Sequence, residues 1–305
     1  CIAPLVKVKY KYYLLFNLWV SVFSSMMLQS CRGLGKNIVY SLGSFISAAG
    51  QVILNIFFIV VLRLGVNGMI SAIILAHVIS GIYVALRINI FQYFKFRVVR
   101  KNAMIKYLRY SSPLVPNSIS WWILSASDRS IILMFLGVSY NGIYSAASKF
   151  SGIYTTLYNI FNLSWTETVS LHLKDKDSID EFKRIQSTVV RICITAALGL
   201  ISIMPFLFNF LVDEKFDQAY YQIPLLTIGA YFSSMVGIVS AYYIADKKTT
   251  IIAKSSMLCA AINILVNLSL VKWIGLYASS ISTIVAYFFL YIIRYKDIKK
   301  RFGIN

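Results

Sequence analysis

Long apolar stretches alternate with short polar gaps along this sequence. Because the hydrocarbon core of a bilayer is about 30 Å thick, a helix that crosses it needs about 20 mostly apolar residues. Nine stretches have this length: 12–31, 37–62, 66–87, 113–136, 140–165, 186–211, 221–243, 250–271 and 275–293. None alternates apolar and polar residues as the short strands of a membrane barrel do. The pattern predicts an all-α integral membrane protein with about nine spanning helices.

The composition supports a lipid environment. Hydrophobic residues make up 58% of the 305 residues and charged residues 13%, whereas soluble domains carry about 25% charged residues. The formal net charge of +19 does not indicate a nucleic-acid partner, because the basic residues gather in the gaps between apolar stretches, as they do in membrane loops.

Lys and Arg are unevenly divided between the two sides of the predicted helices. One side holds the gaps at 32–36, 87–109, 174–191 and 247–254 and the tail from Arg294, which together contain most of the basic residues. The other side holds Lys7, Lys9, Lys11, Arg63, Lys215 and Lys272. Because cytoplasmic loops are rich in Lys and Arg, we predict that the first side, including the C-terminus, is cytoplasmic.

No metal site, cofactor site or enzyme active site is visible. The four cysteines have no C-x-x-C spacing and the two histidines lie far apart, so no metal ligand set follows from them. The acidic cluster Asp213, Glu214 and Asp217 has no His or Ser partner at readable spacing. A membrane glycosyltransferase or polymerase would need a larger external loop than this chain offers. We expect a protein that is not an enzyme.

One internal repeat relates two parts of the chain. Lys36, Ser44, Ala48, Ala49 and Asn55 match Lys248, Ser256, Ala260, Ala261 and Asn267, and Gln51 falls on Asn263. Positions 44, 48, 51 and 55 share one helical face, so the repeat preserves a small and polar stripe. Both copies run outwards from the cytoplasm, which is typical of a parallel repeat.

The repeat predicts two lobes. Residues 1–111 would hold three helices of an N-terminal lobe and a basic cytoplasmic loop, and residues 112–305 the six helices of a C-terminal lobe and a basic tail. If both lobes have six helices, three more precede this chain. The basic stretch from Lys95 to Arg109 fits a loop lying on anionic headgroups, or a phosphate-capture site.

Three charged residues fall inside predicted spans, where each costs about 2.5–3.5 kcal/mol at mid-membrane. They are Asp128, Arg129 and Lys149. On antiparallel neighbouring helices, Asp128 and Lys149 would lie at the same depth, about 12–14 Å from the outer boundary at 1.5 Å per residue. We therefore expect the three charges to meet in one layer.

Polar stripes extend from these charges along both helices. The first helix carries one stripe of Asn117, Trp121, Ser125 and Asp128 and an adjacent one of Ser118, Trp122, Ser125 and Arg129. The second helix carries Ser145, Lys149, Gly152, Thr156 and Asn159. These stripes predict a wet, positively charged cavity that binds sugars and phosphate, with Arg129 supplying a bidentate fork. The alternative is a charge cluster that only pins the two helices together. Gln51, Asn55, Asn263 and Asn267 could line a path or join helices by hydrogen bonds.

Several motifs carry a resemblance to a known family. They are RGLGKN at 32–37, SPLVPNSISWWI at 112–123, SDR at 127–129, LG at 136–137 and GIY at 142–144. With these motifs the chain resembles the Wzx-type polysaccharide and O-antigen flippases of the multidrug/oligosaccharidyl-lipid/polysaccharide (MOP) exporter superfamily. The resemblance implies a MATE-like bundle of two lobes around a central cavity in the bacterial inner membrane.

The resemblance also implies a function. The substrate would be a polyprenyl-diphosphate-linked oligosaccharide, such as a lipopolysaccharide, capsule or exopolysaccharide repeat unit, flipped from the inner to the outer leaflet by alternating access. Coupling to H⁺ or Na⁺ and contact with polysaccharide polymerase or assembly proteins are further expectations. The alternatives are a cation-coupled multidrug exporter of the same superfamily and, from another class, a membrane glycosyltransferase or polymerase.

Overall fold

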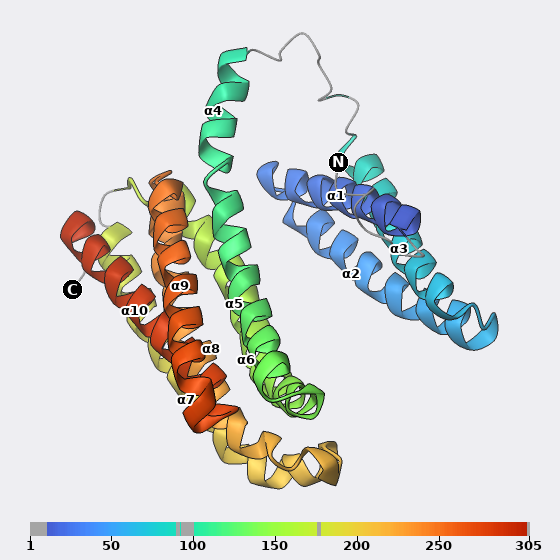
Figure 1. The fold of residues 1–305 in the computed structure, drawn as a ribbon. Coiled ribbons are helices and arrows are strands. Elements are labelled where there is room, and N and C mark those ends of the chain that lie inside the picture. Colours follow the sequence, from blue (N-terminus) through green and yellow to red (C-terminus); the bar gives the residue numbers. More distant parts are fainter. Residues whose placement is uncertain (1–10, 90–91, 93–100, 176–177, 304–305) are drawn as a thin grey trace. The chain divides into compact units, whose positions relative to one another are not determined.

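The computed structural model describes residues 11–89, 92, 101–175 and 178–303. Within these ranges the chain is helical and contains no strand. Its contacts divide it into two units, residues 1–99 and residues 100–305, and each is described here by itself (Figure 1). The basic residues at positions 7, 9, 95, 97, 100 and 176, whose side of the membrane was predicted, lie outside the described residues.

The first unit is built from α1 (Lys11–Gly33), α2 (Asn37–Asn55) and α3 (Gly65–Ile88). A π-helical segment, η2 (Ile56–Val61), extends α2. α3 packs against both other helices, and its contact with α2 is close because Gly43 has no side chain there. At that point the Ser80 hydroxyl donates to the Gly43 carbonyl oxygen at 2.7 Å.

The second unit begins with a short helix, α4 (Lys101–Ser111), followed by six long ones. These are α5 (Leu114–Phe135), α6 (Val138–His172), α7 (Ser178–Leu211), α8 (Ala219–Ala245), α9 (Thr249–Ile274) and α10 (Tyr277–Phe302), with a 3₁₀ turn, η5 (Glu214–Phe216), before α8. α8 packs against α6, α7 and α10, and α9 packs against α5 and α10. This packing brings the polar faces of α5, α9 and α10 together.

The nine predicted spans are confirmed as helices in the described part of the chain, namely α1–α3 and α5–α10. Seven of these helices are long and apolar enough to cross a membrane. α5 and α6, which carry the charged residues predicted inside spans, are not among the seven. The short helix α4 was not predicted; it occupies the described half of the basic stretch 95–109.

A seam of hydrogen bonds joins α5 to α9 along most of their length. The Thr249 hydroxyl of α9 donates to the Tyr110 carbonyl oxygen, just before α5, at 2.9 Å. Further along, Ser256 donates to the Asn117 oxygen at 2.6 Å and Asn267 donates to Asp128 at 3.0 Å. All three pairs are separated by 139 residues. A constant separation means that α5 and α9 run in parallel.

Arg294 is not part of the exposed basic tail to which the sequence pattern assigned it. α10 continues to Phe302, and the Arg294 side chain is only 1% exposed. It lies on the buried stripe of α10 that also includes Ala286, Leu290 and Ile298. Counting basic residues by sequence position missed this, because the count does not register which face of the helix a residue occupies.

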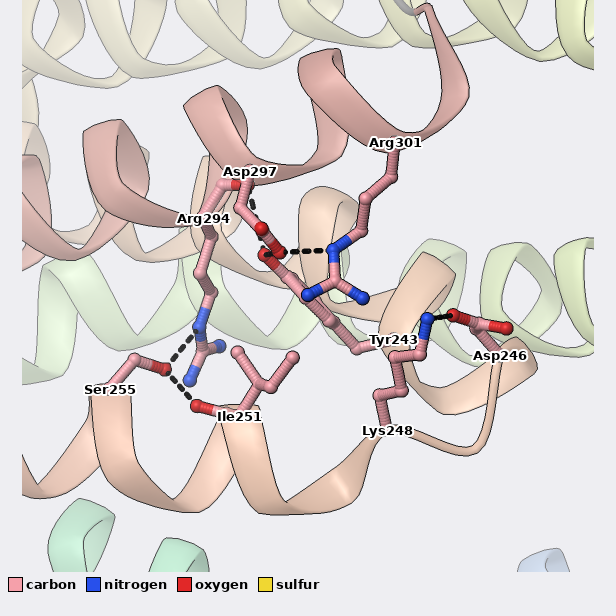
Figure 2. Close-up of polar contacts among 8 residues, drawn as sticks. All are labelled: Tyr243, Asp246, Lys248, Ile251, Ser255, Arg294, Asp297 and Arg301. Atoms are coloured by element: carbon pink, nitrogen blue, oxygen red, sulfur yellow. Dashed lines mark hydrogen bonds and ion pairs between the residues drawn. The ribbon is translucent and has the colours of Figure 1, made fainter.

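Arg294 instead joins the ends of α8, α9 and α10 by hydrogen bonds, and we call this cluster of contacts around Arg294 the clasp. Its guanidinium donates to the hydroxyls of Ser255 (3.0 Å), Ser240 (2.6 Å) and Ser256 (2.7 Å), and to the Ile252 carbonyl oxygen (3.0 Å). Figure 2 shows the bond to Ser255 and, three residues further along α10, Asp297, which pairs with Arg301 at 2.8 Å.

Tyr243 extends the same clasp from α8. Its hydroxyl lies 2.8 Å from the Asp297 carboxylate and 3.1 Å from the Arg294 carbonyl oxygen (Figure 2). Lys248 and Asp246 form a further ion pair at the turn between α8 and α9, at 2.6 Å. The three helices are therefore fixed to one another at this end by charged and neutral hydrogen bonds.

Replacing Arg294 with Ala should destabilise the second unit by about 2–4 kcal/mol, because buried charge-assisted hydrogen bonds are lost and their acceptors remain in the interior. The free energy of unfolding in detergent micelles measures this effect. The control is Arg184→Ala on the exposed side of α7, for which we expect a change within about 0.5 kcal/mol. Equal losses for the two variants would contradict the clasp.

Candidate functional site

A cavity of about 680 Å³ opens in the second unit between α5, α6, α8 and α10. Its wall includes hydroxyl and amide side chains on α6, serine hydroxyls on α8 and the aromatic rings of Trp121, Tyr144, Tyr158 and Tyr287. The volume lies within the range of about 300–1,000 Å³ that is usual for ligand sites. Among the described residues, Asp128 and Arg129 are the charged ones that line it.

Asp128 is held by neutral hydrogen-bond donors. Its side chain is 4% exposed. One carboxylate oxygen accepts from the Tyr144 hydroxyl of α6 at 3.1 Å and from the Thr283 hydroxyl of α10 at 2.8 Å. The other accepts from the Asn267 amide of α9 at 3.0 Å. Three helices therefore converge on this one group of α5.

A second tier of hydrogen bonds supports these donors. Asn267 also donates to Ser279 at 3.0 Å. Asn263, one turn away on α9, donates to Thr283 at 3.2 Å and accepts from Ser127 at 3.2 Å. Both asparagines are fully buried, and neither lines the cavity. Of the two roles left open for Asn263 and Asn267, the structure places them in hydrogen bonds between helices.

Four of the predicted site residues line the cavity: Trp121, Ser125, Asp128 and Arg129. The Trp121 ring stacks on Tyr287 with 5.4 Å between ring centroids and an interplanar angle of 29°. Its indole nitrogen donates to the Asn117 oxygen at 3.2 Å. Arg129 is exposed, so the positive charge at the cavity wall is accessible to water while the negative one is covered.

Three other predicted residues do not line this cavity: Asn117, Trp122 and Lys149. Asn117 is turned towards α9, where it accepts from Ser256. Trp122 is 70% exposed, since one residue further along a helix turns the side chain by about 100°. Lys149 is exposed but belongs to a neighbouring face of α6. Among the described residues no ion pair joins it to Asp128. That the three charges lie in one layer stays a prediction.

The cavity face of α6 differs from the predicted stripe. Gly152, Thr156 and Asn159 were predicted and line the cavity, but the face is centred on Ser148, Ser151, Thr155, Tyr158 and Asn162. These positions recur every three or four residues, and the recurrence is the signal that could have found them. Following the stripe outwards from Lys149 placed its centre to one side of the face that lines the cavity, so the two faces only overlap.

Thr283, Tyr287 and Gly237 belong to the cavity but were not predicted. Thr283 and Tyr287 are four residues apart and share a helical face, which was the available signal. Gly237 lies on α8 where any added Cβ would overlap the Tyr158 hydroxyl. That hydroxyl donates to Asn162 at 3.1 Å. The glycine therefore lets Tyr158 lie against α8 instead of projecting into the cavity.

Gln51 and Asn55 lie on α2 in the first unit and are half-buried. The Asn55 side-chain oxygen is buried and has no hydrogen-bond partner among the described residues. A role for these two residues in lining a transport path stays a prediction.

Comparisons with known proteins give a consistent fold and no family match. No protein-family model and no curated protein sequence matches this chain. A crystal structure described as MATE in the straight conformation aligns with a TM-score of 0.84 at 13% identity, over 96% of this chain and 69% of that one. The outward-facing conformation of a multidrug resistance MATE family transporter of the MOP superfamily gives 0.83 at 14% identity, over the same shares.

A third solved structure differs in its described function. It is a MOP superfamily transporter from Pyrococcus furiosus whose binding pocket is described as having reverse polarity, suggesting a different function. It aligns with a TM-score of 0.79 at 13% identity, over 96% of this chain and 69% of that one. At these identities the comparisons show that the chain has the all-helical, multi-pass fold of MATE transporters.

Replacing Asp128 with Asn should leave the network intact, because the hydroxyls of Tyr144 and Thr283 can rotate and accept from the new amide. We expect the free energy of unfolding to change by less than about 1 kcal/mol. Asp128→Ala should instead cost about 2–4 kcal/mol, because it leaves buried donors without an acceptor. Unfolding titrations of the two variants in detergent measure the difference. A loss for Asp128→Asn as large as that for Asp128→Ala would show that the charge itself holds the helices.

Proposed function

We propose that this chain belongs to a transporter that flips a polyprenyl-diphosphate-linked oligosaccharide from the inner to the outer leaflet of a bacterial plasma membrane. The observation that carries the proposal is the polar cavity in a MATE-type fold, with the exposed Arg129 as its accessible charge. The proposed mechanism is alternating access without covalent chemistry. In this proposal the C-terminus is cytoplasmic, and the two lobes meet between residues 111 and 112.

The cavity wall suits a glycan bearing phosphate. Hydroxyl and amide side chains on α6 and serine hydroxyls on α8 can exchange hydrogen bonds with sugar hydroxyls. The stacked pair Trp121 and Tyr287 offers an aromatic platform for the apolar faces of sugar rings. Arg129 supplies a planar fork that matches the oxygens of a diphosphate. Lys149, exposed on a neighbouring face of α6, would act as a mobile charge near the cavity.

Asp128 is the proposed coupling group. It is a carboxylate at the cavity wall whose hydrogen-bond partners are all neutral. A proton or a sodium ion arriving from the cavity would neutralise a charge that the surrounding protein solvates only by dipoles. Its partners belong to α6, α9 and α10, so a change in its charge would act on three helices at once.

Replacing Arg129 with Gln should reduce glycan export at least about tenfold, because one charge-assisted, bidentate contact with phosphate contributes about 1.5–3 kcal/mol. Arg129→Lys keeps the charge without the fork and should be intermediate. Export is measured as surface glycan in cells that depend on the natural full-length protein, at normal expression. The matched control is Arg184→Gln. Unchanged export in an Arg129→Gln, Lys149→Gln double variant would remove both residues from substrate binding.

A second candidate function is cation-coupled drug export. The buried carboxylate at the cavity wall favours it, as does the multidrug resistance transporter among the structures that share the fold. The two functions separate in one strain: glycan export should be lost on deletion of the gene if the first holds, and ethidium should accumulate if the second holds.

Asp128→Asn tests the coupling in either case. We expect transport in proteoliposomes to lose its dependence on an imposed proton or sodium gradient, because the amide does not titrate and binds cations weakly. Thr156→Val, at another position of the cavity lining, should retain the dependence. A gradient response in Asp128→Asn equal to that of the natural protein would contradict the coupling role.

A further inference from the structure

A second cavity, of about 270 Å³, lies between α7 and α10 and shares no lining residue with the central one. On the α7 side it is lined by Lys183, Gln186, Ser187, Val190 and Arg191. These positions follow a spacing of three and four residues and therefore form one stripe along the helix. We refer to this feature as the α7–α10 cleft.

The opposite wall of the cleft is aromatic. Tyr291 and Tyr295, one turn apart on α10, stack with 5.5 Å between ring centroids and an interplanar angle of 27°. Both pack against the main hydrophobic cluster of the second unit. Gln186 is fixed from behind, because its side-chain oxygen accepts from the Tyr242 hydroxyl of α8 at 3.3 Å. The cleft is thus held on both sides by the folded core.

Two cations stand on one edge of this cleft. Lys183 pairs at 2.8 Å with Asp180, whose side chain is 81% exposed, so solvent screens that pair strongly. Arg191 is exposed, and no carboxylate pairs with it within the described residues. The two positions are separated by about 12 Å along the helix axis. Both side chains are long enough to reach a group bound between them.

Apolar side chains continue the line beyond Arg191. On α7, Ile194 is 43% and Leu198 58% exposed, and on α10 Phe288 is 41% exposed. A polar and cationic end that passes into exposed apolar surface matches a molecule with an anionic head and an apolar tail. Basic pockets between membrane helices on the cytoplasmic side bind lipid headgroups in this way. A free phosphate would make no contact with the apolar part of this surface.

We propose that the α7–α10 cleft binds the phosphate of an anionic phospholipid in the cytoplasmic leaflet, between Lys183 and Arg191. Ser187 and the hydroxyls of Tyr291 and Tyr295 supply further donors, and the acyl chains lie along Ile194 and Leu198. The proposal uses the predicted cytoplasmic orientation and is independent of the transported substrate. The ligand class is an anionic glycerophospholipid, with phosphatidylglycerol as the probe.

The test is retention of phosphatidylglycerol by the purified full-length protein, measured by native mass spectrometry across a lipid titration. Lys183→Gln, Arg191→Gln should weaken retention about tenfold, since two charge-assisted contacts are lost. The control Arg184→Gln, Lys296→Gln removes two exposed charges from the same helices and should change it less than about twofold. Equal losses in the two double variants would overturn the site, because they would show only a general attraction.

Two further arms identify the source of the phosphate. Glycerol 3-phosphate carries the head without the tails and should not displace bound phosphatidylglycerol at equal concentration; displacement would overturn the lipid assignment. Arg191→Lys keeps the positive charge but lacks the planar guanidinium, so this variant should retain less phosphatidylglycerol than the natural protein. Complete displacement of bound phosphatidylglycerol by the zwitterionic phosphatidylcholine would also contradict a site for anionic lipids. Transport activity plays no part in these readouts, so they stand or fall separately from the proposed function.

Discussion

The requirement that every polar group inside a bilayer find a partner governs this structure. The seam between α5 and α9 meets that requirement, with Asp128 as its most demanding member because a buried carboxylate needs several donors. Once Asp128 is turned towards α6, α9 and α10, its neighbour Arg129 must face about 100° away, on the open side. The hydrogen bonds that satisfy one charge therefore present the other to the cavity. Architecture and candidate chemistry come from the same adjacent pair of residues.

The two polar centres of the second unit are joined through the same seam. Arg294 donates to Ser256, Ser256 donates to Asn117, and Asn117 accepts from Trp121 of the cavity wall. Each step is a direct hydrogen bond between side chains, so an unbroken chain of contacts runs from the Arg294 end of the bundle to the cavity wall. Any coupling between the two places would run through this chain. The coupling needs two arrangements of the chain, which double-mutant cycles can detect.

The sequence predicted the spans because their apolar length is a local property, set by the thickness of the bilayer. It predicted Asp128 and Arg129 at the cavity because charges inside spans are costly unless they have a use. It predicted Trp121 there because Trp121 shares a helical face with Asp128. It failed where helix rotation decides the outcome. Trp122 was predicted to line the cavity but lies outside it, and Arg294 was assigned to the tail although it lies on the buried face of α10. Rotation follows from packing against neighbouring helices, and no local pattern records it. The stripe on α6 was traced from Lys149, and this choice shifted it away from Ser148, Ser151 and Thr155, which line the cavity.

The internal repeat shows the same limit, because matching residues of its two copies have different surroundings in the structure. Asn267 of α9 donates to both Asp128 and Ser279 and is fully buried. Its counterpart Asn55 of α2 has a buried side-chain oxygen with no hydrogen-bond partner in the part of the chain that the structure describes. Leaving such an atom unpaired away from water costs at least about 1–3 kcal/mol. Among the described residues, the stripe on α2 therefore lacks the hydrogen-bonding contact that would satisfy Asn55. In the second unit the corresponding stripe already has that contact, with α5.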